Sequence, residues 1–552
     1  MIVTPVLATE SVPPPIASKI TAGTTWWRTP DYLVAVIATI LIVFLHVCLT
    51  PNVGGLWRDE VNTVNLATLP KWQDLWRLHN QDSFPLLFAA TVRIWSGWFG
   101  SGDDSVRILG LIIGLAVVAA FWVNARLTGL RFPFWSLVLA GANPMLIRYG
   151  DSARAYGLSL VFLLLMFGLI WKVANNPAWR WISLAAASAA LSVHATYYNP
   201  VLLFAICAGA FAVALMKRNW RAMFAVIGIG ALAAISLLPY VPTFLRADDW
   251  NFLVRYPFTL PFMWQRLSEV IGSPFSFEVI LWVALVAAAI VAAVAPFART
   301  GPQSKCVALF CGVALVMGIV SYTAFLKMLS YHTNPWYYLS FVTFVAVCID
   351  PLLAPTGAGP HRPLRAAVAA LLLAFTAVPT SQIVAARHTN LDLVGRQLEN
   401  LAGPEDLIVL TTWQCGVTLN RYYKGPAAWT TVPPLPDFHF QSHQPIITQM
   451  QAEAPLRPIF QNIERVLKSG HRVWIVGGAP LPPPGRTPPA LPRAGTDKNG
   501  WRGSEAFYTV WAMQVMYFLH LHITHAQKVR FPDVGPIGQF EHLDVSVFDG
   551  WK

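Results

Sequence analysis

Charged residues are scarce in this chain. They make up 12% of its 552 residues, whereas a soluble globular domain carries about 25%. Hydrophobic residues, in contrast, account for 55%. This balance excludes an ordinary water-soluble enzyme, and it also excludes a disordered chain, which combines low hydrophobicity with high charge. It indicates a protein that uses lipid as part of its solvent.

Cysteine is also scarce, and its six positions match neither a disulfide framework nor the spacing of a metal site. The net charge of +12 would suggest nucleic acid as the partner of a soluble domain. Here many of the basic residues stand between apolar runs, as they do in the cytoplasmic loops of membrane proteins. We therefore expect a lipid bilayer, and no nucleic acid, as partner.

Eleven apolar runs are candidates for membrane-spanning helices, which need about 20 residues with a range of roughly 17 to 25. The predicted spans are 32–50, 105–125, 132–148, 155–172, 180–198, 200–216, 222–240, 276–297, 306–326, 336–350 and 365–380. The third and the last two are the weakest, because they are short or contain Pro. The first is expected to be an uncleaved anchor, since its apolar core is too long for a signal peptide.

Basic residues between the spans set the predicted orientation. With a cytoplasmic N-terminus, one side of the membrane collects Arg126, Arg131, Lys172, Arg180, Lys217, Arg218, Arg221, Lys305, Arg362 and Arg365, as the positive-inside rule requires. The other side then holds loops 51–104, 148–154, 241–275 and 327–335, and everything after about residue 381. The apolar segment 84–99 is placed at the outer interface, because a further span there would move every later basic loop outward.

The predicted fold class is a polytopic α-helical membrane protein with a small C-terminal α/β domain. Residues 1–30 form a cytoplasmic segment, 31–380 a transmembrane module, and 381–552 a soluble extracytoplasmic domain. Strand and helix patterns alternate in this last part. The expected strands are 406–412, 427–432 and 472–477, and the expected helix is 458–469.

The outer loops carry charges that the topology does not require, and such charges are costly near a bilayer unless they are paired or functional. Asp59 and Glu60 follow the first span, and Asp151 lies in the second outer loop. A carboxylate can accept a proton, and a planar guanidinium suits phosphate. The candidate phosphate ligands are Arg107, Arg148, Arg154 and Arg255.

The order of these motifs resembles the GT-C superfamily. The stretches are WRDEVNTVNLA (57–67), DSFP (82–85), SVRILGLIIG (105–114) and DSARAYGLSL (151–160), and HTNPWYY (332–338) matches a late loop more weakly. The likeness is densest over residues 50–200 and is greatest to bacterial proteins related to the protein O-mannosyltransferases and aminoarabinose transferases. The family often reads His-Pro-Pro where this chain reads Ser83-Phe84-Pro85.

The resemblance implies an inverting glycosyltransferase of the bacterial inner membrane, acting outside the cytoplasm. It implies a polyprenyl-phosphate sugar as donor, and a glycan, lipid or protein as acceptor. By position, Asp59 matches the proposed catalytic base, Glu60 its acidic neighbour, and Arg107 an Arg that binds the lipid phosphate. Asp151 matches a second acidic position, which in some members lies near a divalent metal. A nucleotide cofactor is not expected, because the donor carries its own activated bond.

Structural alternatives stay open for each of these residues. Asp59 can be a helix-end charge, Glu60 can cap a helix or orient Arg58, and Arg107 can anchor the chain at the interface. Asp151 can simply pair with Arg148 or Arg154. His46 is expected to be a hydrogen-bonded bundle residue.

Two rival functions also stay open. The first is a transporter or flippase of a lipid-linked glycan, although transporters tend to place ionisable residues at the bilayer midplane, where these spans have almost none. The second is a non-catalytic protein of cell-envelope assembly. Such an anchor would not need eleven spans or a carboxylate pair.

Overall fold

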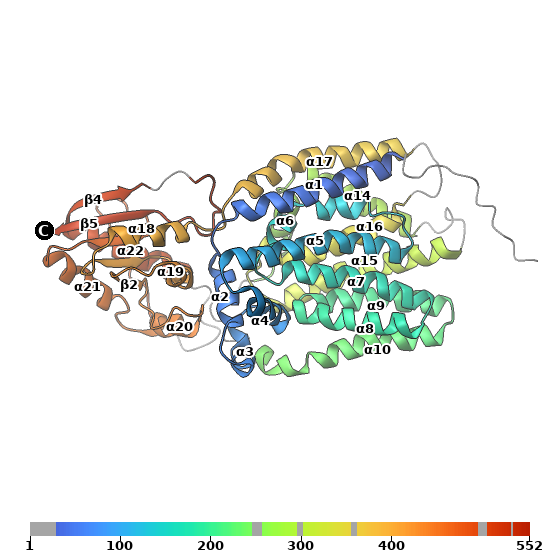
Figure 1. Cartoon of the computed structure of the whole chain (residues 1–552), viewed down its shortest axis with the longest axis horizontal. Coiled ribbons are helices and arrows are strands. Elements are labelled where there is room, and N and C mark those ends of the chain that lie inside the picture. Colours follow the sequence, from blue (N-terminus) through green and yellow to red (C-terminus); the bar gives the residue numbers. More distant parts are fainter. Residues whose placement is uncertain (1–28, 246–256, 295–301, 355–360, 495–504, 531–533) are drawn as a thin grey trace, which may run out of the picture.

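The computed structural model describes residues 29–245, 257–294, 302–354, 361–494, 505–530 and 534–552. It has two parts, a long bundle of helices and a smaller α/β domain that contains the C-terminus (Figure 1). The predicted fold class is therefore confirmed. Arg255, one of the candidate phosphate ligands, lies outside the described residues.

The bundle contains nine stretches that are long and apolar enough to cross a membrane within the described residues. Its long helices are α1 (Pro30–Asn52), α5 (Asp103–Thr128), α7 (Tyr156–Asn175), α8 (Trp179–Ala195), α9 (Asn199–Met216), α10 (Trp220–Ser236), α14 (Phe277–Val294), α15 (Pro302–Leu329), α16 (Leu339–Leu352) and α17 (His361–Ala385). Nine of the eleven predicted spans coincide with the nine apolar stretches. Of the other two, 180–198 corresponds to α8, which has 17 residues, and 132–148 is a broken helix.

The broken helix runs through the interior of the bundle. It consists of the π-helical turn η3 (Leu137–Gly141) and α6 (Pro144–Gly150). At one end the backbone amide of Trp135 donates to Asp350 at 2.6 Å, near the end of α16. At the other end Asp151 meets His46 of α1. Irregular backbone is tolerated at membrane depth when protein surrounds it, which explains how a segment without one continuous helix connects the two ends.

The segments expected on the outer side meet at one end of the bundle. The first outer loop (51–104), which we call loop one, forms α2 (Arg58–Ala67), α3 (Trp72–Arg77), the turn η2 (His79–Gln81) and α4 (Leu86–Phe99). The other outer segments contribute α13 (Leu260–Ile271) and the turn η6 (Pro335–Tyr338). With 14 residues, α4 is short for a span, and it lies beside α2 at this end (Figure 1).

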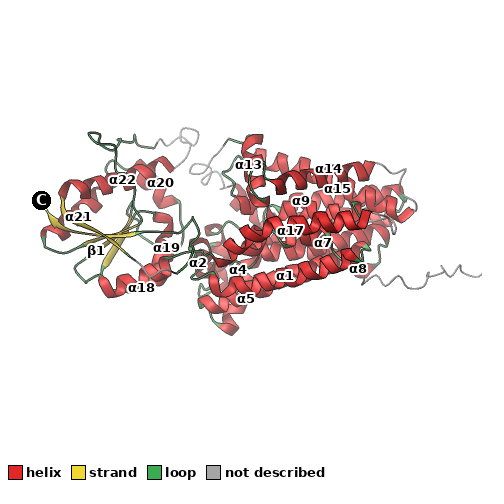
Figure 2. Ribbon diagram, turned by 90° about the horizontal axis from the view of Figure 1, so that it is seen from above, coloured by secondary structure: helices red, strands yellow, loops and turns green. Residues whose placement is uncertain are grey.

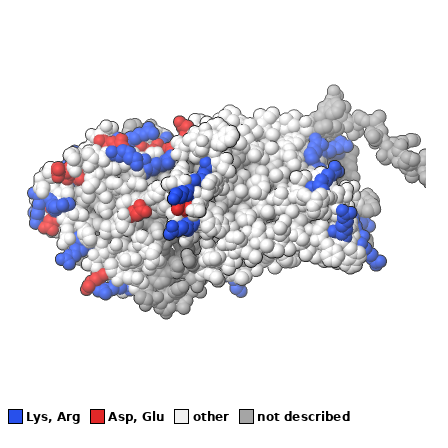
Figure 3. All heavy atoms as spheres, turned by 60° about the horizontal axis from the view of Figure 1, so that its bottom comes forward, with Lys and Arg blue, Asp and Glu red and all other residues white. Residues whose placement is uncertain are grey.

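The opposite end of the bundle is basic. Figure 3 shows Lys and Arg side chains over the end far from the α/β domain, with no acidic side chain among them on that face. The α/β domain and its junction with the bundle carry both signs. An ion pair between Arg365 and Asp31, at 3.5 Å, joins α17 to α1 at the basic end. This asymmetry is the one that the loop charges predict.

The α/β domain is built on a five-stranded sheet of order β2-β1-β3-β5-β4. Its strands are β1 (Leu407–Leu410), β2 (Ala428–Thr431), β3 (Val473–Val476), β4 (Ile523–Val529) and β5 (Val545–Trp551). Strand β1 pairs in parallel with β2 and β3, whereas β5 pairs antiparallel with β3 and β4. The three predicted strands are confirmed as β1, β2 and β3. Strands β4 and β5 lie in a part of the chain where the sequence predicts no strand.

Helices cover both faces of this sheet (Figure 2). They are α18 (Leu391–Leu401), α19 (Gly416–Tyr422), α20 (Gln444–Gln451), α21 (Arg457–Lys468) and α22 (Glu505–His522). Alternate residues of β1 face opposite sides: Val409 joins the core beneath α21 and α22, and Ile408 joins the core beneath α18. Central strands buried on both faces read as continuous apolar runs, which is why β1 and β3 were recognisable.

The α/β domain is docked through polar contacts on the end of the bundle that carries α2 and α4. Arg421 of α19 forms an ion pair with Asp103 at 2.7 Å. The Tyr422 hydroxyl donates to the same carboxylate at 2.6 Å and accepts from the backbone amide of Leu56 at 2.6 Å. These contacts hold α19 against the starts of α2 and α5, where the candidate residues lie.

Candidate active site

The four carboxylates of the WRDEVNTVNLA, DSFP and DSARAYGLSL stretches gather where loops one and two (51–104 and 148–154) meet the α/β domain, a region that we call the mouth. They belong to Asp59, Glu60, Asp82 and Asp151. The mouth also contains Arg107, Arg148 and Arg154. The structure therefore brings together all the predicted site residues that it describes.

Glu60 is locked in a buried bidentate pair. Its two carboxylate oxygens accept from Nη1 and Nη2 of Arg107 at 2.6 and 2.8 Å. They also accept from the backbone amides of Ala153 at 2.9 Å and Trp57 at 3.2 Å. Burial acts to raise the pKa of Glu60, but the Arg107 guanidinium and His388 together outweigh this effect and hold the pKa well below the usual range. Glu60 is thus a fixed anion that caps α2 and joins loops one and two.

Arg107 has little capacity left for a further ligand. Besides Glu60, it donates to the carbonyl oxygens of Gly54 at 3.3 Å and Gly55 at 2.8 Å. Its side chain is 6% exposed. The turn it holds needs glycine at residue 54, where φ is +70°. The phosphate-binding role of Arg107 stays a prediction, and the contacts observed are those of a residue that shapes loop one.

Asp82 and Arg154 form the second buried pair. Nη1 of Arg154 donates to Asp82 at 2.8 Å, to Thr63 Oγ1 at 2.6 Å and to the backbone oxygen of Asp59 at 3.0 Å. Burial acts to lower the pKa of Arg154, but the charges of Asp82 and Asp59 raise it by more, so that the pKa lies above its ordinary value. Sequence reasoning missed Asp82 as a site residue. The signal was its place in the DSFP stretch that carries the family resemblance.

Asp151 pairs with His46, not with Arg148 or Arg154. Nδ1 of His46 lies 2.7 Å from Oδ1 of Asp151, which is consistent with His46 as a hydrogen-bonded bundle residue. Oδ2 of Asp151 is buried without a hydrogen-bond partner in the described part of the chain. A Cβ at Gly110 or Gly114 of α5 would overlap Asp151. This close approach gives a physical reason for glycine at both positions of the SVRILGLIIG stretch.

The surroundings of Asp151 do not fit a divalent metal ion. A small cavity there is lined by Asp151 together with Arg107, Arg148 and His388, so two cations face the position a metal would take. Metals such as Mg²⁺ or Mn²⁺ need several oxygen ligands. Among the described residues, no group of three or more His, Cys, Asp or Glu side chains is placed to share an ion. We therefore assign no metal ion to this site.

Asp59 differs from the other three carboxylates. Its side chain is 23% exposed, and its closest cation is Arg58, with Nε 3.6 Å from Oδ1. Within the described residues its carboxylate accepts no hydrogen bond. It lies in the first turn of α2, where the helix dipole favours an anion. Burial and neighbouring Tyr337 raise the pKa of Tyr331, and the charge of Asp59 adds to this rise.

Arg148 differs from Arg107 and Arg154 in its contacts with the described residues, although Nε of Arg154 is also buried without a hydrogen-bond partner there. The Arg148 guanidinium forms no hydrogen bond or ion pair with another described residue. It shares the small cavity with Thr50 at the end of α1 and with His388 after α17. Burial lowers the pKa of His388 to about 4, and the charge of Arg148 adds to that effect, so His388 is neutral at pH 7. No sequence signal pointed to His388, which became visible only in the fold.

Solved structures similar to this chain include two of ArnT from Cupriavidus metallidurans, one bound to undecaprenyl phosphate and one in the apo state. They are 12% and 13% identical to this chain, with TM-scores of 0.47 and 0.46. Each comparison covers 80% of this chain, and 93% or 92% of the other. No family model and no curated protein matches the chain. At these values the fold rests on the elements described above, and the chemistry rests on the residues of the mouth.

Proposed function

We propose that this chain is an integral-membrane glycosyltransferase of GT-C type. It moves a sugar from a polyprenyl-phosphate carrier to an acceptor hydroxyl on the extracytoplasmic face of a bacterial inner membrane. One observation carries the proposal: among the four carboxylates of the motif stretches, Asp59 alone is partly exposed and accepts no hydrogen bond from a described residue, and its one ion pair is a 3.6 Å contact with Arg58. The order of motifs from residue 57 to residue 160 supports the family.

Asp59 serves as the general base in this proposal. The acceptor hydroxyl is a poor nucleophile at neutral pH, and a positioned carboxylate can take its proton. The hydroxyl oxygen forms a bond to the anomeric carbon while the bond from that carbon to the phosphate oxygen breaks. The phosphate leaves with the electron pair, still attached to its lipid. A single displacement of this kind inverts the anomeric configuration.

Arg148 is the better candidate for the carrier phosphate than Arg107 or Arg154. Those two already donate to Glu60 and Asp82, whereas Arg148 has free donors beside the apolar residues Leu49 and Val53 at the end of α1. A carrier lipid can bring its phosphate to such a place while its chain stays in the bilayer. A guanidinium there would stabilise the charge that develops on the leaving phosphate.

The proposal is tested by turnover in nanodiscs. The purified chain is given polyprenyl-phosphate mannose, glucose, galactose, arabinose and aminoarabinose in turn, each with a methyl glycoside, a glycolipid or a Ser/Thr-rich peptide as acceptor, and the release of polyprenyl phosphate is measured. We expect release from at least one donor, and a loss of at least about 100-fold in Asp59→Asn, since general-base catalysis typically contributes about 10²–10⁴-fold. Asp74→Asn is the matched control, because Asp74 is half-buried in the same loop.

Two outcomes would contradict the proposal. Near-normal turnover by Asp59→Asn would remove its role as base. Movement of the intact donor between leaflets, with no release from any donor, would favour the transporter.

A further inference from the structure

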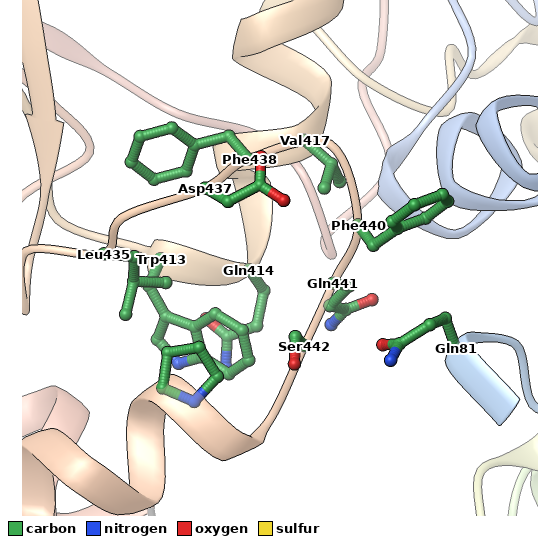
Figure 4. Close-up of a pocket in the computed structure, with 11 residues that line it drawn as sticks. Gln81, Trp413, Gln414, Val417, Leu435, Asp437, Phe438, Phe440, Gln441 and Ser442 are labelled. Carbon is green, nitrogen blue, oxygen red and sulfur yellow. The ribbon is translucent and has the colours of Figure 1, made fainter. Parts of the chain in front are cut away.

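A second cavity lies between the α/β domain and loop one, on the side of α2 that faces the domain. It has a volume of about 210 Å³. Figure 4 shows Gln81 of loop one facing Gln441 and Ser442 of the domain across it. An engineered cavity of about 150 Å³ accommodates benzene, so this one has room for a six-membered ring. We call it the Trp413 pocket.

The lining of the Trp413 pocket combines aromatic rings with uncharged polar groups. Trp413, Phe438 and Phe440 supply the rings, and Gln81, Gln414 and Gln441 supply side-chain amides. Among the described residues, its one charged lining residue is the carboxylate Asp437, and no Lys or Arg lines it. A sugar ring has C–H faces that pack on aromatic rings and hydroxyls that pair with amides and carboxylates. An anionic ligand would lack a cation here.

Polar groups of the pocket are unsatisfied within the described residues. The indole Nε1–H of Trp413 is buried and has no hydrogen-bond partner, although the Trp413 side chain is only 3% exposed. The side-chain amides of Gln81, Gln414 and Gln441 likewise donate to and accept from no other described residue. A buried donor without a partner is costly. Ligand hydroxyls in the pocket would satisfy the three side-chain amides.

The pocket is held in register with Asp59 by helix α2. Asn62 lies three residues after Asp59 and so on the same face of the helix. Its Oδ1 accepts from the backbone amide of Gln441 at 2.9 Å, and its Nδ2 donates to the backbone oxygen of Gln81 at 2.8 Å. A helix rises about 1.5 Å per residue. One helical turn therefore separates the candidate base from the residue that joins both walls of the pocket.

We infer that the Trp413 pocket binds a neutral sugar residue of the acceptor, and that the acceptor is a glycan. This inference rests on the proposed function, because Asp59 is taken to act on a hydroxyl of the same molecule. The pocket holds one sugar of the acceptor while a neighbouring sugar presents its hydroxyl to Asp59. The α/β domain is then part of the acceptor site.

Binding of simple glycosides tests the inference. The full chain in nanodiscs, free of sugar-headed detergent, is titrated with the methyl glycosides of mannose, glucose, galactose and arabinose, and contact is read by saturation-transfer NMR. We expect at least one to bind. Gln81→Leu and Gln441→Leu should each weaken it by roughly 3- to 10-fold, the effect of one lost hydrogen bond. Gln444→Leu is the matched control, because Gln444 is exposed beside the pocket and does not line it.

Trp413→Phe provides a second variant that keeps an aromatic ring but offers a smaller ring face to the sugar. It should weaken binding by a similar factor. A wild-type chain that binds none of the four glycosides would overturn the inference. So would binding that Gln81→Leu and Gln441→Leu leave unchanged, or binding of a Ser/Thr-rich peptide that these variants weaken in place of glycoside binding.

Asp59→Asn separates this inference from the proposed function. The variant should bind the glycosides as the wild type does, because Asp59 does not line the pocket. Glycoside binding without turnover of any donor would leave the sugar site standing and remove the transferase. Turnover of a donor without glycoside binding would remove the acceptor site alone.

Discussion

At the scale of single residues, the partner of each charge separates structural from catalytic candidates. Glu60, Asp82 and Asp151 belong to the same mouth as Asp59, but each has a close buried partner in Arg107, Arg154 or His46. A pair of this kind needs both members, because removal of one leaves an uncompensated buried charge. Asp59 has no such partner among the described residues. Substitution of Asp59 is therefore expected to abolish activity, whereas substitution of a paired residue is expected to destabilise the folded state.

Arg107→Ala tests that distinction. Breaking a buried ion pair typically costs about 3–5 kcal/mol, so the variant should unfold at a clearly lower temperature and yield less folded protein. Arg107→Lys should recover little of this, because Lys cannot reproduce the bidentate contact with Glu60. Arg77→Ala, at an exposed position of the same loop, is the control. A stable Arg107→Ala variant with only weakened donor binding would instead support the phosphate role that the sequence suggests.

Glu541 makes the stability of the docked domain depend on pH. It is fully buried and accepts from the backbone amide of Arg58 at 2.9 Å. Burial raises its pKa to about 7, although the charge of Arg58 opposes the rise. Between its ordinary value of 4.5 and pH 7, the folded chain keeps a proton that the unfolded chain has lost. The contribution of Glu541 to stability therefore falls as the pH rises through this window.

Glu541→Gln should remove this dependence, since its amide oxygen still accepts from Arg58. The unfolding temperature of the variant minus that of the wild type should increase from pH 4.5 to pH 7, by about 2 °C or more, and then level off. His388 has a lowered pKa, so its contribution to stability rises with pH below pH 6.5. This contribution is the same in both proteins and cancels when their unfolding temperatures are subtracted. A difference that stays constant with pH would show that Glu541 does not titrate in this range.

At the scale of elements, the sequence predicted what is periodic or continuous and missed what is not. The run DLIVLTT identified β1 because a central strand buried on both faces is apolar throughout. Strand β4, with sequence ITHAQKV, is mostly exposed and carries no such signal. The site followed the same rule, because the motifs located its carboxylates but not their partners. Glu60 and Arg107 are 47 residues apart, and His46 and Asp151 are 105 apart, and only the packing of helices brings them together.

The contact between α5 and the second outer loop is a feature of elements that can be tested. A Cβ at Gly114 would overlap Oδ1 of Asp151, so Gly114→Ala should displace the loop and cost about 1–3 kcal/mol, as overpacking does. Gly228→Ala, in the apolar helix α10, is the control, because nothing lies within 4 Å of the position of its Cβ. Thermal unfolding of both variants measures the difference. Equal unfolding temperatures would mean that α5 and the loop can separate without loss.

At the scale of the whole molecule, charge is distributed along the long axis. The end of the bundle away from the α/β domain is basic, and the mouth and the domain carry charges of both signs (Figure 3). A lipid-linked donor enters from the bilayer, whereas a glycan acceptor comes from water. In the proposed reaction, a mouth with Arg148 beside the membrane-spanning helices and the Trp413 pocket beside the domain would serve both partners at once.

The orientation of the chain follows from this distribution. We expect the basic end to face the cytoplasm, because Lys and Arg accumulate on that side of membrane proteins. Single cysteines at Gln73 of α3 and Asn400 of α18 should then react with a membrane-impermeant maleimide in whole cells, and a cysteine at Arg221 of α10 should react only after lysis. All three positions are exposed. Cys48 and Cys207, which are half-buried, are replaced by Ala in the parent chain so that the label reports the new residue. Labelling of Arg221→Cys alone would put the mouth in the cytoplasm, where the proposed lipid-linked donor of an outward-facing transferase is not presented. Labelling of only one of Gln73→Cys and Asn400→Cys would separate loop one from the α/β domain, and both the mouth and the Trp413 pocket require these two to lie on the same side.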